Sequence, residues 1–524
     1  MLLIPQKVRG CMKKILSEKG CCCIFNILAI LMYAVFFYYG LGLTGENNAN
    51  LGDEFIYFRT ESVILSAFWI GVAISCLYFI GKVSERFKSF KSRNLLLAIV
   101  CILSAIISFL WIFNSKTEPF SDQLLICYYA NDFNHGDYSA LQRGGYVALY
   151  PQQLGMITLL RFLFYFFGTE NFMAFKCLSA ASVPLLVFSG CKVVRILSDD
   201  NVKAEIYYLL AVLFCFPMYV YTSFVYGDLI STSICMFSVW MFLSCLKKIH
   251  WGKLLSFGIS IGIAVQLRKN VLILVAALGI VVLVKLLFGK CWKCFIVGVT
   301  LVFGVLFFHL AIWWGYHDVR PDDATAIPAS LFISMGLNDD YGHPGWYNDY
   351  HYATFKELDY DTQAANAKAF GDLQLYFDYF MREPDKMVDF FVRKMNSQWN
   401  APMYQCIVMN SSIVDKQPAL IQNIYQFGRV EQLIEFYMKV YQLLLYGGIL
   451  FLLAVERKNY FRIEKYVLLI AVYGGFLFSM IWEAKTRYIF PYLLMQLPYM
   501  AIGIKEIVNM LEKKIKFRGG NKAG

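Results

Sequence analysis

The chain has 524 residues, of which 58% are hydrophobic and only 16% are charged. This composition excludes a soluble globular protein, which needs far more polar surface at this length, and indicates a membrane protein with many spans. The net charge of +11 fits nucleic-acid binding or basic cytoplasmic loops, and its distribution along the chain favours the loops.

Residues 1–94 are expected to form a cytoplasmic tail and two spans that precede the core. A basic tail leads into an apolar run over 21–43, which is too long for the hydrophobic core of a signal peptide. A short acidic loop and a second apolar run over 63–81 follow. The next segment, KVSERFKSFKSRN, is strongly basic, and we therefore place it on the cytoplasmic side.

The first long polar stretch, residues 114–171, follows a predicted span over 95–113 and is expected to lie outside. It contains the sequence PFSDQ with Asp122. The segment 153–168 is apolar but short and has Arg161 near its centre, so we expect a helix in the outer membrane interface. If the segment 153–168 does not cross the membrane, all the connections further along the chain that fall on the cytoplasmic side are basic.

The remaining apolar runs complete an all-α polytopic membrane protein with about twelve transmembrane helices and both termini in the cytoplasm. Residues 316–435 form one long polar segment with helical spacing of its apolar residues, which predicts an extracytoplasmic α-rich cap between helices 9 and 10. The core covers 95–315, and residues 436–524 form the C-terminal spans and a basic tail. The expected later spans are 172–193, 204–222, 229–246, 253–267, 271–288, 294–314, 436–455, 466–482 and 488–507.

Four isolated polar groups fall at the predicted outer ends of the spans. They are Ser121-Asp122, Gly227-Asp228, Arg268-Lys269-Asn270 and the sequence EAKTRY that begins at Glu483. Basic residues outside run against the positive-inside rule and indicate a local anion. An acid beside two basic groups suits sugar transfer from a lipid phosphate. The carboxylate accepts the proton of the acceptor hydroxyl, while Arg and Lys bind the departing phosphate.

Each of these groups also has a structural interpretation. Asp122 can be an exposed helix cap, and Asp228 can be a cap or the structural partner of Arg268. Basic side chains near the membrane can reach lipid headgroups. The candidate residues are Asp122 and Asp228 for catalysis; Arg268, Lys269, Lys485 and Arg487 for the donor phosphate; and Tyr150, Gln152, Trp346 and Tyr347 for substrate contacts. No residue is assigned to a metal.

These motifs carry a family resemblance. The order of PFSDQ, GGYVALYPQQLG, LRKN, PGWYN and WEAKTRYIFPY resembles the GT-C superfamily of polyprenyl-phosphate-sugar-dependent glycosyltransferases, and more closely its bacterial family 39-like members. The resemblance covers most of residues 95–507 and implies a bacterial cell membrane enzyme with an extracytoplasmic active site. It matches Asp122 to a first-loop catalytic acid and Arg487 to a basic residue near the lipid phosphate. Protein mannosyltransferases have two acids in this loop, whereas Ser121-Asp122-Gln123 has one, so a protein acceptor and a divalent cation (Mg²⁺ or Mn²⁺) both stay open.

The expected function is transfer of a hexosyl or pentosyl group from a polyprenyl-phosphate donor in the bilayer to a hydroxyl of a glycan, lipid or protein, in modification of the cell-envelope or cell-wall glycans. No nucleic-acid partner is expected. One alternative is a polysaccharide polymerase or ligase, and another is a lipid-linked glycan transporter or flippase. A transporter with two similar halves should carry its linker in the centre of the chain, whereas the hydrophilic insert lies late.

Overall fold

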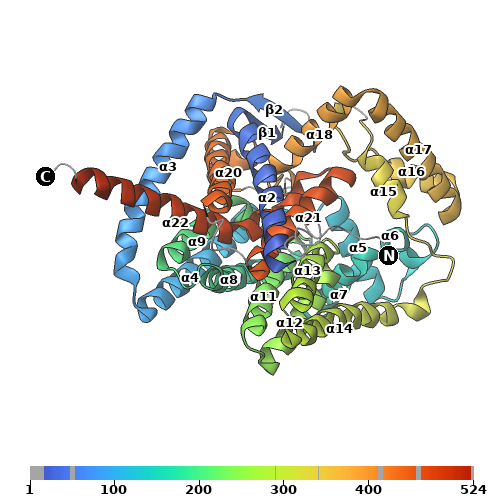
Figure 1. The fold of residues 1–524 in the computed structure, drawn as a ribbon. Coiled ribbons are helices and arrows are strands. Elements are labelled where there is room, and N and C mark those ends of the chain that lie inside the picture. Colours follow the sequence, from blue (N-terminus) through green and yellow to red (C-terminus); the bar gives the residue numbers. More distant parts are fainter. Residues whose placement is uncertain are drawn as a thin grey trace, which may run out of the picture.

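The computed structural model describes residues 17–47, 54–289, 291–339, 342–410, 417–455 and 462–520. The part of the basic tail before Ser17 lies outside these residues. The described chain is almost entirely helical (Figure 1), and the prediction of an all-α polytopic membrane protein is confirmed.

Nine helical segments of the described chain are long and apolar enough to cross a membrane. A continuous apolar helix satisfies its own backbone hydrogen bonds, which is the condition for crossing a bilayer. These segments are α2 (Glu18–Gly42), α3 (Val63–Val83), α4 (Phe90–Ser115), α8 (Phe172–Leu197), α11 (Asp228–Lys247), α13 (Val271–Gly289), α14 (Trp292–Gly315), α20 (Arg429–Val455), and η8 (Ile463–Tyr466) with α21 (Val467–Ile481).

Three further expected spans are also helical but less regular. A broken span consists of α9 (Val202–Leu213), α10 (Phe216–Val220) and η4 (Tyr221–Ser223), with a bend of 53°. Pro217 lies in the first turn of the second part, and because proline lacks a backbone N–H it cannot continue the hydrogen-bond ladder of the first part. The last two are α12 (Trp251–Leu267), with 17 residues, and α22 (Phe490–Gly520).

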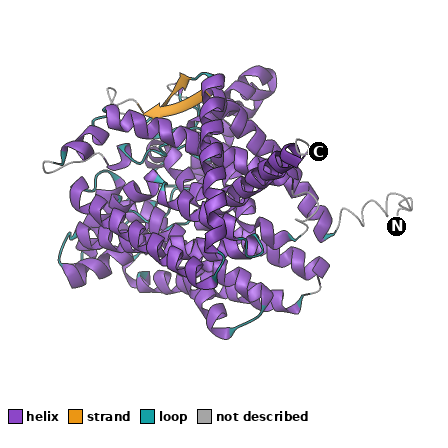
Figure 2. Cartoon of the chain, turned by 90° about the vertical axis from the view of Figure 1, so that its left-hand side faces the viewer, coloured by secondary structure: helices purple, strands orange, loops and turns teal. Residues whose placement is uncertain are grey.

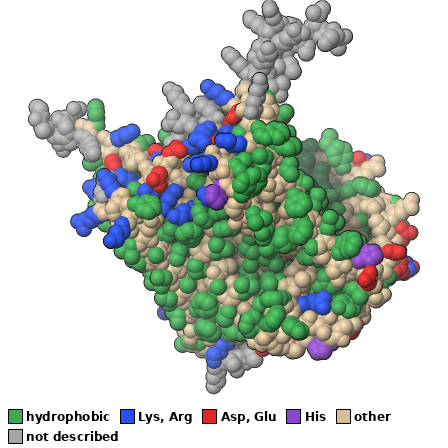
Figure 3. Space-filling model, turned by 90° about the horizontal axis from the view of Figure 1, so that it is seen from below, with side chains coloured by type: hydrophobic (Ala, Val, Ile, Leu, Met, Phe, Trp, Pro, Cys, Tyr) green, Lys and Arg blue, Asp and Glu red, His purple; other side chains and the backbone are tan. Residues whose placement is uncertain are grey.

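Small residues bring some of these helices into backbone contact. A Cβ atom on Gly304 of α14 would lie 2.3 Å from the carbonyl oxygen of Gly258 on α12. A Cβ atom on Gly262 would lie 2.4 Å from the carbonyl oxygen of Gly304. Such close approach is typical of packing inside membranes, where the hydrophobic effect does not drive helices together. The outer face of α14 remains apolar, and Figure 3 shows the largely hydrophobic surface on this side of the molecule.

The expected acidic loop between the first two spans contains a β-hairpin instead. Strands β1 (Leu43–Asn47) and β2 (Ile56–Thr60) pair antiparallel, with Leu43 opposite Thr60 (Figure 2). Arg59 on β2 forms ion pairs with Glu46, Glu61 and Glu435, so the acidic residues of this segment have a basic partner at its centre. The hairpin therefore packs onto the start of α20.

The first polar stretch of the core is mostly helical. It contains α5 (Asp122–Asn134), α6 (Tyr146–Leu149), η3 (Pro151–Gln153) and α7 (Leu154–Phe167). As expected, α7 is too short to cross, since its 14 residues span about 21 Å. Arg161 on α7 donates to the carbonyl of Phe133 and to Asn134 Oδ1, and its charge is thereby accommodated locally.

Besides the short α19 (Ala419–Tyr425), four α-helices lie between α14 and α20, in the segment predicted to form the cap. They are α15 (Ala329–Gly336), α16 (Tyr350–Glu357), α17 (Thr362–Arg382) and α18 (Pro384–Trp399). Figure 1 shows them together at one end of the molecule. A small apolar core that includes Leu331, Phe355 and Ala365 also contains Leu149 of α6, so the cap packs on the same region that follows α5.

The basic connections assigned to the cytoplasm gather at the end of the bundle opposite α5 and the cap. Arg93 and Arg195 both form ion pairs with Glu205, and Lys285 forms ion pairs with Glu18 and Glu464. This two-ended arrangement follows the predicted topology. Which end faces the cytoplasm stays a prediction.

Candidate active site

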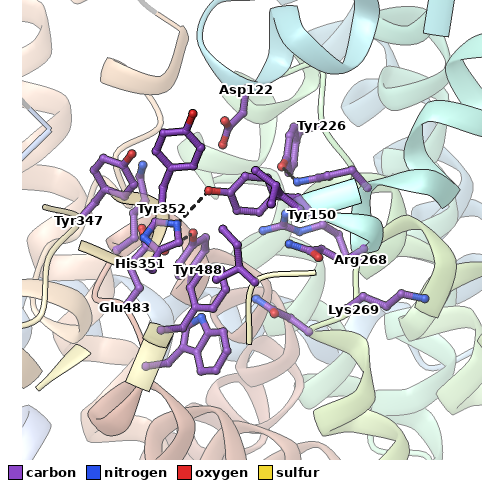
Figure 4. A pocket seen from close by; sticks show the side chains of 18 of the residues that line it. Asp122, Tyr150, Tyr226, Arg268, Lys269, Tyr347, His351, Tyr352, Glu483 and Tyr488 are labelled. Carbon is purple, nitrogen blue, oxygen red and sulfur yellow. Dashed lines mark hydrogen bonds between the residues drawn. The ribbon is translucent and has the colours of Figure 1, made fainter. Parts of the chain in front are cut away.

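A cavity of about 1080 Å³ lies where the cap meets the ends of several membrane helices. Eight of the ten predicted site residues line it, although they come from five separate parts of the chain (Figure 4). The eight are Asp122, Tyr150, Gln152, Arg268, Lys269, Tyr347, Lys485 and Arg487. Asp228 and Trp346 are not part of the cavity wall.

Asp122 is the first residue of α5, and the helix therefore begins at the cavity. Ser121 precedes it with a φ of 53°, which turns the chain sharply into the helix. The hydroxyl of Tyr146 donates to Asp122 Oδ1 at 3.2 Å, while Oδ2 accepts no hydrogen bond from a described residue. A helix N-terminus stabilises negative charge. The site thus holds an oriented carboxylate with one oxygen available to a ligand.

Arg268 reaches the cavity from the connection between α12 and α13, and Asp228 lies behind it. Asp228 begins α11, is 1% exposed, and lies 3.0 Å from Arg268 Nη2. The guanidinium of Arg268 covers the ring of Tyr226 at 4.8 Å. Asp228 therefore does not line the cavity, and its predicted catalytic role stays a prediction. It is the structural partner of Arg268, because a buried charge requires a partner of opposite sign.

Arg487 is buried, with 4% of its surface exposed. The rings of Phe224, Tyr226 and Tyr488 surround its guanidinium at 5.2 to 5.3 Å, and Nη1 contacts Met409 Sδ at 3.7 Å. No carboxylate of the described residues forms an ion pair with it. A buried cation without an anionic partner is unfavourable, so this side chain is suited to bind an anionic ligand.

The connection that carries Arg487 is attached to the cap. Trp346 pairs with Ala484 in a parallel β-bridge, and Ala484 N donates to the carbonyl of Gly345 at 2.7 Å. Trp346 is 4% exposed and donates through Nε1 to Ser397 Oγ at 3.2 Å. The substrate contact predicted for Trp346 is not supported by its position, because this side chain does not line the cavity. It packs inside the protein and fixes the connection that follows α21.

A second attachment of the same connection comes from Lys394 on α18. Its Nζ donates to the carbonyl of Trp482 at 2.7 Å and also to the carbonyl of Gly336. Burial lowers the pKa of Lys394 to about 7. Lys394 thus joins α15, α18 and the end of α21 directly behind the cavity.

Aromatic side chains form the wall on the cap side. The Tyr150 hydroxyl lies 2.9 Å from His351 Nε2, and the Tyr347 hydroxyl donates to Asp349 Oδ1 at 2.7 Å (Figure 4). His351 is 2% exposed. Burial lowers the pKa of His351 to about 4, and nearby Asp349 opposes this shift only in part. The imidazole is therefore neutral at physiological pH.

Glu483 belongs to the polar group EAKTRY, to which the sequence assigned phosphate-binding basic residues but no role for this acid, and it lines the cavity. It is 8% exposed, and Tyr488 donates to its Oε2 at 3.2 Å. Burial raises the pKa of Glu483, and the charges of Lys485 and Arg487 oppose the shift. The sequence signal was present, because an acid stands between an apolar run and the basic residues of a very short connection.

Lys485 also lines the cavity and forms an ion pair with Glu54 of the segment before β2. Among the described residues, no three His, Cys, Asp or Glu side chains are grouped in a way that could hold a metal ion. No residue is therefore assigned to a divalent cation.

Comparisons with known proteins identify a family and include a similar solved structure. No curated protein matches the sequence. The archaeal oligosaccharyltransferase AglB from Archaeoglobus fulgidus, solved in complex with an inhibitory peptide and a dolichol-phosphate, is similar with a TM-score of 0.39 and 12% identity. The comparison covers 83% of this chain and 52% of that protein, so the chain spans about half of its length. A family model described as conserved hypothetical integral membrane protein matches residues 18–363, which is more than half of the sequence. The chain belongs to this family of conserved integral membrane proteins.

Proposed function

We propose that the chain is a membrane glycosyltransferase that moves a sugar from a polyprenyl-phosphate donor to an acceptor hydroxyl. The observation that carries the proposal is the meeting, in one cavity, of the available carboxylate of Asp122 and the buried guanidinium of Arg487, which forms no ion pair with a carboxylate of the described residues. The resemblance of the sequence motifs to GT-C glycosyltransferases points in the same direction.

The donor phosphate binds beside Arg268, Lys269 and Arg487. Guanidinium groups bind phosphate oxygens through paired N–H donors, and the aromatic rings around them restrict access of water. Leu272 and Ile273 of α13 and Phe478 of α21 line the neighbouring wall of the cavity. A polyprenyl chain can therefore remain in the bilayer while its phosphate enters the site, which matters because each buried CH₂ contributes about 0.8 kcal/mol.

Asp122 acts as the general base. The acceptor oxygen forms a bond with the anomeric carbon while its proton passes to the Asp122 carboxylate. The bond between the anomeric carbon and the phosphate oxygen breaks, and its electron pair leaves with the polyprenyl phosphate. Arg487 and Arg268 stabilise the negative charge that develops there. Tyr146 keeps the carboxylate oriented through its hydrogen bond to Oδ1.

The direct test is incubation of the purified protein with a panel of polyprenyl-phosphate sugars and detection of free polyprenyl phosphate. Release that depends on Asp122 supports the proposal, and the same panel with Asp122→Asn is the control. Activity only with pyrophosphate-linked donors indicates the polymerase or ligase alternative. Movement of lipid-linked sugars across vesicles without release indicates a transporter.

The location of the reaction is part of the same proposal. We place the active site on the extracytoplasmic face of a bacterial cell membrane, where the acceptor is a glycan, lipid or protein of the cell envelope. The support is the gathering of basic connections at the opposite end of the bundle.

A further inference from the structure

The residue that follows Asp122 joins α5 to two distant parts of the chain. Gln123 is the second residue of α5 and is 4% exposed. Its Oε1 accepts the backbone N–H of Val225 at 2.9 Å, and its Nε2 donates to the backbone carbonyl of Met409 at 3.0 Å. These partners lie 102 and 286 positions further along the chain, so one buried amide connects three separate segments.

Both partners of this amide belong to segments that contact the guanidinium of Arg487. Val225 stands between Phe224 and Tyr226, whose rings lie 5.2 Å from the guanidinium carbon. Met409 approaches Nη1 of the same guanidinium with its Sδ at 3.7 Å. The amide therefore ties the backbone on both sides of the phosphate-binding cation to the start of α5.

The two partners require a side chain that is uncharged and has both a donor and an acceptor. A backbone N–H needs an acceptor and a backbone carbonyl needs a donor, and an amide supplies both. An ionised carboxylate has no donor, and an apolar side chain has neither group. A buried backbone group that loses its partner is unfavourable, so these two hydrogen bonds hold the amide in one orientation.

The position of Asp122 follows that of Gln123, because adjacent Cα atoms are about 3.8 Å apart. Tyr146 orients the carboxylate through Oδ1, whereas Gln123 fixes the backbone that carries it. In the proposed reaction the base meets the acceptor hydroxyl while Arg487 binds the departing phosphate, and both must reach one sugar. A misplacement of about 1 Å can lower the rate of such a step by about 10²-fold.

We infer, on the basis of the proposed function, that Gln123 is a positioning residue for sugar transfer and sets the place of Asp122 relative to Arg487. Gln123 does not line the cavity, so it acts through Asp122 and not by contact with donor or acceptor. The cation keeps a further attachment, because the backbone N–H of Arg487 donates to Gln405 Oε1 at 2.9 Å. Loss of the Gln123 amide should therefore lower the rate of the chemical step more than it weakens donor binding.

The test replaces the amide with an apolar side chain of similar length. Gln123→Met removes both hydrogen bonds, and we expect turnover per bound donor, at saturating donor, to fall about 10- to 100-fold. The affinity for polyprenyl phosphate should change by less than about threefold. Turnover is the release of polyprenyl phosphate from the polyprenyl-phosphate sugar that the panel identifies, and affinity is equilibrium binding of labelled polyprenyl phosphate.

A matched control lies in α22. Gln496 is 1% exposed, accepts the hydroxyl of Tyr33 at 3.0 Å and donates to the carbonyl of Tyr492 at 2.9 Å. Its amide thus has the same burial and the same number of hydrogen bonds, but it is not part of the cavity wall. Gln496→Met should lower the midpoint of thermal unfolding as Gln123→Met does, and should leave turnover per bound donor unchanged.

A double-mutant cycle tests whether Gln123 acts through Asp122. If it positions this carboxylate, Gln123→Met should lower the residual turnover of Asp122→Asn by less than about twofold. A purely structural role predicts the same factor in both backgrounds. If Gln123→Met does not fold, the cycle is run with Gln123→Asn, which keeps the amide but is one methylene group shorter and cannot reach both partners from the same backbone position.

The outcomes separate this inference from the proposed function. Wild-type turnover of Gln123→Met, an equal loss in Gln496→Met, or an equal factor in the Asp122→Asn background overturns the inference and leaves the proposed function in place. If no polyprenyl-phosphate sugar is turned over, the proposed function fails, and the inference fails with it. If Asp122→Asn keeps wild-type turnover, the assignment of the base fails, and so does a positioning role that acts through it.

Discussion

At the scale of single residues, the available oxygen of Asp122 sets the first prediction. Asp122→Asn keeps an oxygen that can accept the hydrogen bond of Tyr146, but the amide cannot take up a proton from an acceptor hydroxyl. We expect normal folding and donor binding, with turnover reduced by about 10²–10⁴-fold, the range for general-base catalysis. Turnover is measured at matched expression and saturating donor.

Two neighbouring acids are the controls for Asp122. Asp137 accepts the backbone N–H of Ser139 in a turn, and Asp132 lies within α5 away from the cavity wall. Asp132→Asn and Asp137→Asn should therefore retain most of the activity. Wild-type turnover of Asp122→Asn would show that another group is the base, and Glu483 would then be the next candidate.

Arg487 carries the second prediction. Arg487→Ala should weaken binding of polyprenyl phosphate by about 1.5–3 kcal/mol, the range for a hydrogen bond to a charged group. Arg487→Lys should restore only part of this loss, because an ammonium cannot bind two phosphate oxygens as a planar fork does. The measurement is equilibrium binding of labelled polyprenyl phosphate. An alanine variant with unchanged affinity would assign Arg487 to protein packing against Phe224 and Tyr226.

The sequence predicted which charged residues belong to the site, but it did not predict which residues these side chains contact. Arg268 and Arg487 could be predicted because basic residues in short outer connections contradict the usual charge distribution. Asp228 has the same sequence signal as Asp122, and only the folded chain shows that it lies behind Arg268. Tyr146 and His351 gave no signal, since tyrosine and histidine are common in polar loops and their roles depend on tertiary contacts.

At the scale of helices, the contact between α12 and α14 gives a prediction about stability. Gly304→Ala places a methyl group within 2.3 Å of the carbonyl oxygen of Gly258, so the two backbones must separate. We expect a destabilisation of about 1–3 kcal/mol, typical of overpacking. Gly279→Ala on α13 is the matched control because no atom lies within 4 Å of its added carbon. Thermal unfolding of the detergent-purified protein measures both, and equal midpoints would contradict the close packing.

The contact between α16 and the segment that follows α6 predicts a pH dependence. The pKa of His351 falls from 6.5 to about 4 on folding, because burial disfavours the charged imidazole. Between these pH values the unfolded chain binds more protons than the folded one, so stability decreases as the pH falls through this window. The free energy of unfolding is therefore highest above about pH 6.5, and the neutral buried His351 accounts for a decrease of about 3 kcal/mol as the pH falls to about 4.

The corresponding experiment follows the unfolding midpoint from about pH 7 down to about pH 5, on the acid side of the ordinary histidine pKa. His351→Gln retains a polar side chain but does not titrate in this range, and its midpoint should change less with pH than that of the wild type. A parallel decline of both proteins would assign the pH dependence to other groups.

The helices themselves were the most predictable elements. Apolar runs of membrane length fixed the positions of α2, α8 and α13 to within a few residues. The hairpin of β1 and β2 was missed because two strands of five residues in an acidic segment carry no strong alternation of apolar side chains. Asp122 was placed in a loop for a similar reason: α5 is stabilised by packing against α7, which the local sequence does not reveal.

At the scale of the whole molecule, the last prediction concerns which end of the bundle faces outside. The cavity lies at the end that carries the cap, whereas Arg93, Glu205 and Lys285 lie at the opposite end. The positive-inside rule places the second end in the cytoplasm.

Single cysteines are introduced at Asp349 and at Ser89, two exposed positions at opposite ends, in a background without the exposed Cys23 and Cys76. A membrane-impermeant maleimide should label position 349 in intact cells, and position 89 only after the membrane is opened. Lys247, exposed at the end of α11, should behave like position 89 if the bundle has two distinct ends. Labelling of positions 89 and 247 with protection of 349 would reverse the orientation and move the proposed reaction to the cytoplasmic face.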